Sequence, residues 1–198
     1  MKLFSYVLSV DDGAAPNPFW GWCTLAICKP IIRRVAQPGD WIVGIGPAHK
    51  PTRGKLIYAM RVEEVLPLDE YFNDPRFQKK KPQAGAKDSR SGVGDNVYYK
   101  VRGDWAILPG GTHTHANMKK DTRGRNVLVA RHFYYFGRDA VTLPDNLKLL
   151  AQGGQGHRSW FPLTYIQMLS EWLAKTHQPG IRGDPDGLDS CGGCPVED

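Results

Sequence analysis

Short apolar segments separated by glycine- and proline-rich loops are the feature that most limits how this chain can fold. In the first segment, Lys2–Val10, apolar and polar side chains alternate, which is typical of a β-strand. Further strands are expected at Trp41–Ile45, Leu56–Leu66, Asn96–Val101, Trp105–Leu108 and Asn126–Phe136, the last bent near His132. No regular crossover helices separate these segments, which argues against a doubly wound parallel sheet.

Only three segments favour a helix. Cys23–Arg34 has apolar residues at helical spacing, although Pro30 should end or kink that helix. Leu68–Phe72 is short, and Trp160–Thr176 is the clearest amphipathic helix. Pro109–Arg125 is expected to be a basic loop. Many short strands with few helices predict an α+β domain, a small mixed β-barrel with flanking helices.

The length of 198 residues suits one domain with one substantial core. We expect residues 1–178 to form it and residues 179–198 to be a flexible acidic tail. No apolar run reaches the roughly 20 residues that a membrane span needs. The N-terminal segment lacks the long apolar stretch of a signal peptide, so a cytoplasmic location without membrane contact is expected.

Four cysteines, Cys23, Cys28, Cys191 and Cys194, are too few in a chain of this length for a disulfide scaffold. The last two form a C-x-x-C pair, which could be half of a zinc site or a redox pair. No second pair has ligand spacing, so an exposed reduced tail is the favoured interpretation. The sequence therefore predicts neither a metal nor a cofactor.

Positive charge is concentrated in the middle of the chain. Residues 76–138 hold fourteen Lys and Arg against four acids, a balance of +10, whereas residues 180–198 carry −4. A basic segment suits a polyanion such as nucleic acid, or it only keeps loops soluble. The residues expected to contact a phosphate backbone are Lys79, Lys80, Lys81, Lys119, Lys120, Arg123 and Arg125.

Two sets of motifs resemble known families. Pro38–Gly44, Leu56–Val65 and Tyr71–Phe77 resemble the PUA-like superfamily, especially its EVE, ASCH and YTH branches. Ala15–Phe19, Cys23–Ala26, Gly94–Tyr98 and Phe133–Gly137 together look like the second family of nucleotide-modification-associated domains, over roughly residues 1–175. The resemblance implies a setting in nucleotide or DNA modification, and a PUA-like pocket would hold an extruded base.

The Phe19–Thr24 loop is the strongest candidate binding site. Gly21 lets backbone approach a ligand, and the flanking indoles of Trp20 and Trp22 offer faces on which a base can stack. The alternative is that both tryptophans cover one end of the barrel. Polar groups such as Arg76 and Asn96 could read a base edge, or could serve turns. The predicted ligand-binding residues are Asn17, Trp20, Trp22, Cys23, Thr24, Arg76, Asn96 and Tyr98.

No catalytic set can be identified from spacing. Cys23 with His132 as base, or Asp95, are weak candidates, and any such pairing would have to arise from the fold. His113 and His115 lie in a basic glycine-rich segment, where a solvent or phosphate contact is favoured over a metal.

Three functions remain open at this point. The leading one is a module that binds a modified base or nucleotide, with nucleic acid and proteins of modification systems as partners. The others are an enzyme of nucleotide or base modification, and a protein-interaction module with a basic face.

Overall fold

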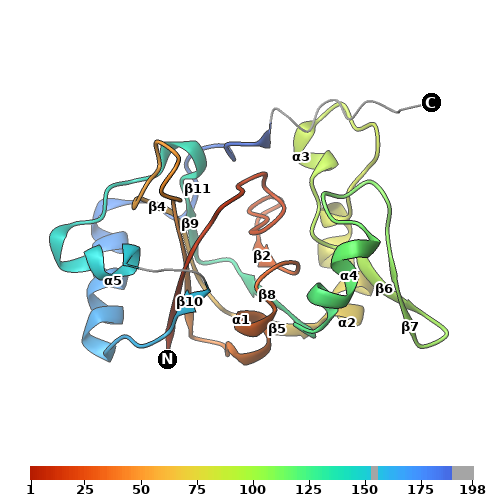
Figure 1. Cartoon of the computed structure of the whole chain (residues 1–198), viewed down its shortest axis with the longest axis horizontal. Helices are drawn as coiled ribbons and strands as arrows, with labels where there is room; N and C mark the ends of the chain where they lie inside the picture. The colour runs from red at the N-terminus through yellow and green to blue at the C-terminus, as the bar shows by residue number, and fades with distance from the viewer. Residues whose placement is uncertain (153–155, 189–198) are drawn as a thin grey trace.

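The largest element of the fold is a six-stranded sheet (Figure 1). The structure, a computed structural model, describes residues 1–152 and 156–188. The sheet order is β10-β1-β3-β4-β9-β11. Its strands are β1 (Leu3–Val7), β3 (Trp41–Ile45), β4 (Leu56–Arg61), β9 (Phe133–Tyr135), β10 (His157–Arg158) and β11 (Gly180–Ile181). β1 runs parallel to β3, and β3, β4 and β9 are antiparallel neighbours.

A smaller antiparallel sheet, β2-β8-β5, lies beside it. It consists of β2 (Cys23–Leu25), β8 (Asn126–Ala130) and β5 (Glu64–Pro67). The hairpin of β6 (Tyr98–Val101) and β7 (Asp104–Ile107) forms a separate two-stranded sheet at one end of the molecule, opposite α5 (Figure 1).

The helices are α1 (Pro30–Val35), α2 (Leu68–Asn73), α3 (Ser89–Gly92), α4 (His115–Thr122) and α5 (Leu163–Thr176). Three 3-10 helices, η1 (Pro75–Lys80), η2 (Gly137–Asp139) and η3 (Asp145–Ala151), complete the described elements. The α+β class predicted from the sequence is confirmed.

Alternation along the strands gives the six-stranded sheet two apolar faces. Leu3 and Val43 pack with η3 and α5, whereas Phe4, Ile42 and Tyr6 pack toward β2, β8 and α1. A further core cluster joins the outer side of the small sheet to α2, η1 and the β6–β7 hairpin. The result is a series of layers, as expected for elements that each bury one face.

The predicted barrel is wrong, because the described strands form open sheets and do not close. The chain passes from the large sheet to the small one between β4 and β5, and returns between β8 and β9. Glu63 fixes both crossings together: its Oε1 accepts the N–H groups of Arg131 and His132 at 2.9 and 2.8 Å. The predicted strands Leu56–Leu66 and Asn126–Phe136 are therefore each divided between two sheets.

Two predicted local structures also differ. The segment Cys23–Arg34 begins as strand β2, and Pro30 starts α1 instead of ending a helix, which suits a residue without an N–H at the first helical position. Pro109–Arg125 was expected to be a loop but contains α4, which begins with a capping box between Thr114 and Asn117.

The acidic segment is partly ordered. Gly180–Ile181 pairs with β9, and Lys50 forms an ion pair of 2.6 Å with Asp186. Part of the segment predicted as a flexible tail therefore contacts the domain, while Cys191 and Cys194 lie outside the described residues. Within the described chain, no helix is long and apolar enough to span a membrane.

Candidate functional site

A cavity of about 390 Å³ lies where β1, the β2–α1 turn and the start of α4 meet. Its apolar wall includes Leu8 and Ile27, and its polar wall includes Cys28, Lys29 and His113. The remaining lining residues are Ser9, Val10, Asp12, Ala14, Ala15, Thr112 and Asn117. We call this the Cys28 cavity.

The turn between β2 and α1 presents Cys28 to the cavity in a strained backbone. Cys28 and Lys29 have φ angles of 57° and 39°, in the left-handed region that costs a non-glycine residue about 1–2 kcal/mol. Both backbone groups of Cys28 are held by buried side chains. Its N–H donates to Asp121 Oδ1 at 2.9 Å, and Arg33 Nε donates to its carbonyl at 2.7 Å.

Three side chains form a row that ends at the cavity. Cys28 Sγ lies 3.5 Å from His113 Nε2, and His113 Nδ1 lies 2.5 Å from Asp121 Oδ2. Tyr98 donates its hydroxyl to the same carboxylate oxygen at 2.8 Å, and Arg33 donates to the Asp121 carbonyl. We call these five residues the Asp121 cluster.

α4 brings the row together. His113 immediately precedes the N-cap Thr114, and Asp121 occupies the last turn of the helix. The Asp121 side chain is 1% exposed, while that of His113 is 17% exposed. The carboxylate is therefore sealed inside, and the imidazole reaches from it to the cavity.

The charges of the row reinforce one another. Burial alone would lower the pKa of His113, but its bonds to Asp121 and Cys28 outweigh burial and raise the pKa to about 10. Burial would raise the pKa of Asp121, yet the bond from His113 and further contacts with Tyr98 and Arg33 lower it. Burial lowers the pKa of Lys29, the second cation at the cavity.

The geometry suits a nucleophile with its base better than a metal. A Cys–His–Asp row places the sulfur and the carboxylate on opposite nitrogens of one imidazole. One metal ion could then meet only the sulfur and Nε2, and four-coordinate sites need more ligands. Among the described residues, no group of three or more His, Cys, Asp or Glu could hold a metal.

The predicted base-stacking loop holds its aromatic residues against cations. The Arg131 guanidinium lies 4.2 Å from the Trp22 ring centroid, and that of Arg76 lies 5.6 Å from it. Lys79 Nζ lies 5.6 Å from the Trp20 ring. Both indoles are half-buried, so part of each ring remains accessible.

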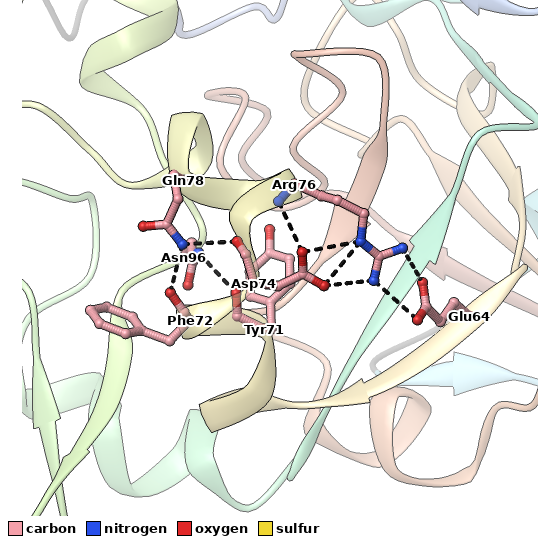
Figure 2. Close-up of polar contacts among 7 residues, drawn as sticks. All are labelled: Glu64, Tyr71, Phe72, Asp74, Arg76, Gln78 and Asn96. Atoms are coloured by element: carbon pink, nitrogen blue, oxygen red, sulfur yellow. Dashed lines mark hydrogen bonds and ion pairs between the residues drawn. The ribbon is translucent and has the colours of Figure 1, made fainter.

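Arg76 and Asn96 are engaged within the protein (Figure 2). Arg76 bridges Asp74 at 2.6 Å and Glu64 at 2.8 Å, and the bond from Arg76 lowers the pKa of Asp74. The Asn96 amide donates to the carbonyls of Tyr71 and Phe77. Asn96 is 1% exposed. Since Tyr71 lies in α2 and Phe77 in η1, these two bonds of its amide link the two helices.

Asp95 belongs to a second buried polar group. It accepts the hydroxyls of Thr24 and Tyr71, both at 2.7 Å. Lys80 Nζ donates to Asn17 Oδ1 at 2.7 Å and to two backbone carbonyls, those of Asn17 and Trp22. We call Asp95, Thr24, Tyr71, Lys80 and Asn17 the Asp95 cluster; none of these five residues is more than 1% exposed.

The placement of Lys80 corrects one prediction. A lysine buried to 1% exposure cannot contact a phosphate backbone from this position. Lys79, Lys119, Lys120, Arg123 and Arg125 are exposed, and Lys81 is half-buried over the Phe72 ring at 3.7 Å.

The weak catalytic candidates are also separated from solvent or from one another. Cys23 is fully buried beside Met60 Sδ at 3.8 Å, and burial raises the pKa of its thiol above the ordinary range. The His132 ring instead packs edge-on against Trp41 and Tyr134. Among the predicted ligand-binding residues, Tyr98 belongs to the Asp121 cluster, because its hydroxyl donates to the Asp121 carboxylate.

Cys28 and Asp121 were missed as site residues from the sequence. A local signal existed, because Thr114 and Asn117 favour a helix start that would place His113 and Asp121 about two turns apart. Nothing in sequence spacing connects Cys28 to residues 85 positions later.

A second cavity, of about 470 Å³, lies along Ser5–Val7 and residues 156–160. It includes His157, Arg158 and Trp160, but no cysteine or acid lines it among the described residues. The Cys28 cavity, in contrast, combines a cysteine, a histidine and a lysine on its wall.

Comparison with protein families gives one finding. The family model described as nucleotide modification associated domain 2 matches residues 1–191. No match was found among curated proteins or solved structures.

Proposed function

Since the chain belongs to the nucleotide modification associated domain 2 family, we propose that it binds a nucleotide, or a modified base within nucleic acid, in the Cys28 cavity. The carrying observation is that two cations, Lys29 and His113, share this cavity with an apolar wall. A phosphate group needs the cations, and a base needs the apolar wall.

The size of the cavity supports a single nucleotide unit. Small-molecule sites typically enclose about 300–1,000 Å³, and this cavity lies near the lower limit. Leu8, Ile27 and two alanines supply the apolar wall. Asp12 stands on the same rim and can accept a bond from an exocyclic amino group.

Positive charge outside the cavity favours a strand of nucleic acid as the source of the base. Lys119, Lys120 and Arg123 are exposed on and after α4, whose first turn borders the cavity. Lys120 is close enough to Lys29 to help lower the pKa of that lysine. A strand could follow these cations while one base enters the cavity.

Nucleotide titrations test the proposal. We expect deoxynucleoside monophosphates to raise the melting temperature, and Lys29→Gln to weaken binding by about tenfold, or about 1.4 kcal/mol. Lys175→Gln is the matched control, since Lys175 is exposed on the distant α5. Equal affinity of the two variants would contradict a site at Lys29.

Salt dependence separates nucleic acid from a protein partner. We expect oligonucleotide binding to weaken with salt, and Lys119→Gln with Lys120→Gln to reduce the slope by about 2. If neither nucleotides nor oligonucleotides bind at low salt, the basic face serves an acidic protein instead. Proteins of a modification system are the partners that the family suggests.

A further inference from the structure

The row from Cys28 through His113 to Asp121 has the order of parts found in enzymes that use a thiol nucleophile. A nucleophile contacts one nitrogen of an imidazole, and a buried carboxylate orients the ring through the other. We propose that Cys28 is a catalytic nucleophile that removes an acyl group from a substrate in the Cys28 cavity, with His113 as its acid and base. The nucleotide nature of that substrate rests on the proposed function above.

Asp121 has the properties of a positioning residue. Its Oδ2 fixes Nδ1 as the nitrogen that carries a proton, so that Nε2 faces the sulfur. Its Oδ1 holds the Cys28 N–H, so one carboxylate sets both partners of the 3.5 Å contact. A carboxylate needed only for folding would not have to hold both the Cys28 backbone and the imidazole beside its thiol.

The strained turn supports a role for the Cys28 sulfur at the cavity. Two consecutive left-handed residues cost free energy, and the anchoring of Cys28 by Asp121 and Arg33 keeps that geometry in place. Cys28 is half-buried and lines the cavity, whereas Cys23, five positions earlier, is sealed in the core. Of these two described cysteines, Cys28 is the one that can meet a substrate.

Charged and titratable groups face Cys28 from every neighbouring element. His113 is a cation at neutral pH, and a cation beside a cysteine favours the nucleophilic thiolate. Lys29 and Arg33 add positive charge from the α1 side, and Asp121 adds negative charge from α4. The hydroxyls of Tyr6 in β1 and Tyr98 in β6 complete the set.

Donors for a developing oxyanion lie in the same cavity. Asn117 Oδ1 accepts the Thr114 N–H at 3.0 Å, so the amide oxygen is committed and its NH₂ group is the free end. Both Asn117 and Lys29 line the cavity with Cys28. Such donors stabilise the tetrahedral intermediate of acyl transfer, which is why we infer a carbonyl carbon as the electrophile.

The reaction balances without an added oxidant or reductant. The Cys28 sulfur bonds to the carbonyl carbon of an ester or amide, and His113 gives its proton to the departing oxygen or nitrogen as that bond breaks. Water or an amino group then attacks the thioester and gives a proton to His113, and the carbon–sulfur bond breaks. The thiolate and the imidazolium are restored.

Alkylation mapped by mass spectrometry tests the nucleophile in the folded full-length chain. We expect iodoacetamide to modify Cys28 much faster than Cys23, with each cysteine quantified in its own peptide. His113→Asn should slow Cys28 alkylation by about tenfold or more, both at pH 6 and at pH 7. His115→Asn, at an exposed neighbour, is the matched control and should change neither.

Acylation tests the reaction. With p-nitrophenyl acetate as probe, we expect an acetyl thioester on Cys28 and release of nitrophenol, both lost in Cys28→Ala and strongly reduced in His113→Asn. Asp121→Asn alone is a weaker test, because Asp121 also supports the fold through Tyr98 and Arg33. Unchanged Cys28 alkylation and acylation in His113→Asn would overturn the proposal.

Protection by a nucleotide distinguishes this inference from the proposed function. If adenosine or thymidine monophosphates bind and slow Cys28 acylation, both stand. If acylation depends on His113 but no nucleotide protects Cys28, the nucleophile stands and the nucleotide site fails. If nucleotides bind while Cys28 reactivity is independent of His113, the cavity is a binding site and the nucleophile is refuted.

Discussion

The Asp95 and Asp121 clusters use similar parts in different settings. Each centres on a buried aspartate that accepts a tyrosine hydroxyl, from Tyr71 in one and Tyr98 in the other. In the Asp95 cluster, Lys80 spends its donors on three oxygen atoms of the protein. In the Asp121 cluster, the row from Asp121 through His113 ends at the Cys28 sulfur, and Cys28 lines the cavity.

Their electrostatics follow from these settings. Burial raises the pKa of Asp95, and the opposing effect of Lys80 is insufficient to reverse it. The pKa of Asp121 is lowered despite burial, because the bond from His113 and the charge of Arg33 hold its carboxylate. A sealed polar cluster can only stabilise the fold, whereas an open one can also act on a ligand.

The largest expected effect on stability comes from the Asp95 cluster, which is sealed from solvent. Lys80→Met would remove the charged donor shared by three oxygen acceptors and leave Asp95 without its neighbouring cation, at a cost of about 3–5 kcal/mol in the free energy of unfolding. Urea unfolding measures this. Lys79→Met, one residue earlier and exposed, should change stability by less than about 0.5 kcal/mol.

The same variant checks the division between the clusters. Under conditions where Lys80→Met remains folded, Cys28 should be alkylated at the wild-type rate, since no member of the Asp95 cluster contacts it among the described residues. A slowed reaction at Cys28 would show that the clusters are coupled and that the comparison fails.

Gly124→Ala should disturb the Asp121 cluster and lower the free energy of unfolding by about 2–3 kcal/mol. A Cβ there would lie 2.4 Å from Arg33 Cζ, and the guanidinium cannot move without losing its bonds to Cys28, Asp121 and Asn126. We therefore expect both lower stability and slower Cys28 alkylation. Gly92→Ala, where a Cβ meets nothing within 4 Å, is the control.

Local sequence patterns could predict much of the fold. The alternation in Lys2–Val10 and the apolar spacing in Trp160–Thr176 correctly indicated β1 and α5. The two-sheet arrangement could not be predicted, because it depends on Glu63 accepting bonds from Arg131 and His132, 68 and 69 positions away.

The candidate site was harder still. The sequence singled out the basic segment, and His113 only as a solvent or phosphate contact, whereas Asp95 and Asp121 are both single acids in polar segments. Only long-range packing decides which of them is sealed and which holds a histidine against a cavity. The cysteines show the same problem, since Cys23 in the conspicuous aromatic loop is buried and Cys28 is the accessible one.

A third buried aspartate sharpens the comparison, with an expected effect of about 2 kcal/mol. Asp11 accepts the Tyr135 hydroxyl but has no ion-pair partner within the described residues, and burial raises its pKa to about 6. A carboxyl whose pKa is raised by folding stabilises most below about pH 4, and this contribution is lost as the pH rises through about 6.

Asp11→Asn should remove this pH dependence. Its stability relative to wild type should therefore improve by about 2 kcal/mol between pH 4 and pH 8, whatever the constant cost of the amide. Melting temperatures across this range measure it, with Glu171→Gln, at an exposed position of α5, as the control. Parallel curves for Asp11→Asn and wild type would mean that Asp11 is ionised at little cost.

The smallest expected effect comes from the two cysteines, which separate packing from reactivity. Cys23→Ala removes a sulfur packed against Met60 in the core and should cost about 1 kcal/mol. Cys28→Ala removes a half-buried sulfur whose hydrogen-bond partner among the described residues is His113, and should cost less than about 0.5 kcal/mol. Reactivity, quantified peptide by peptide, should show the opposite order: fast alkylation of the Cys28 peptide should persist in Cys23→Ala, whereas Cys23 should stay slow in Cys28→Ala. A residue that matters little to stability and greatly to reactivity is what an open cluster should contain, and a large stability loss in Cys28→Ala would instead make its contact with His113 structural.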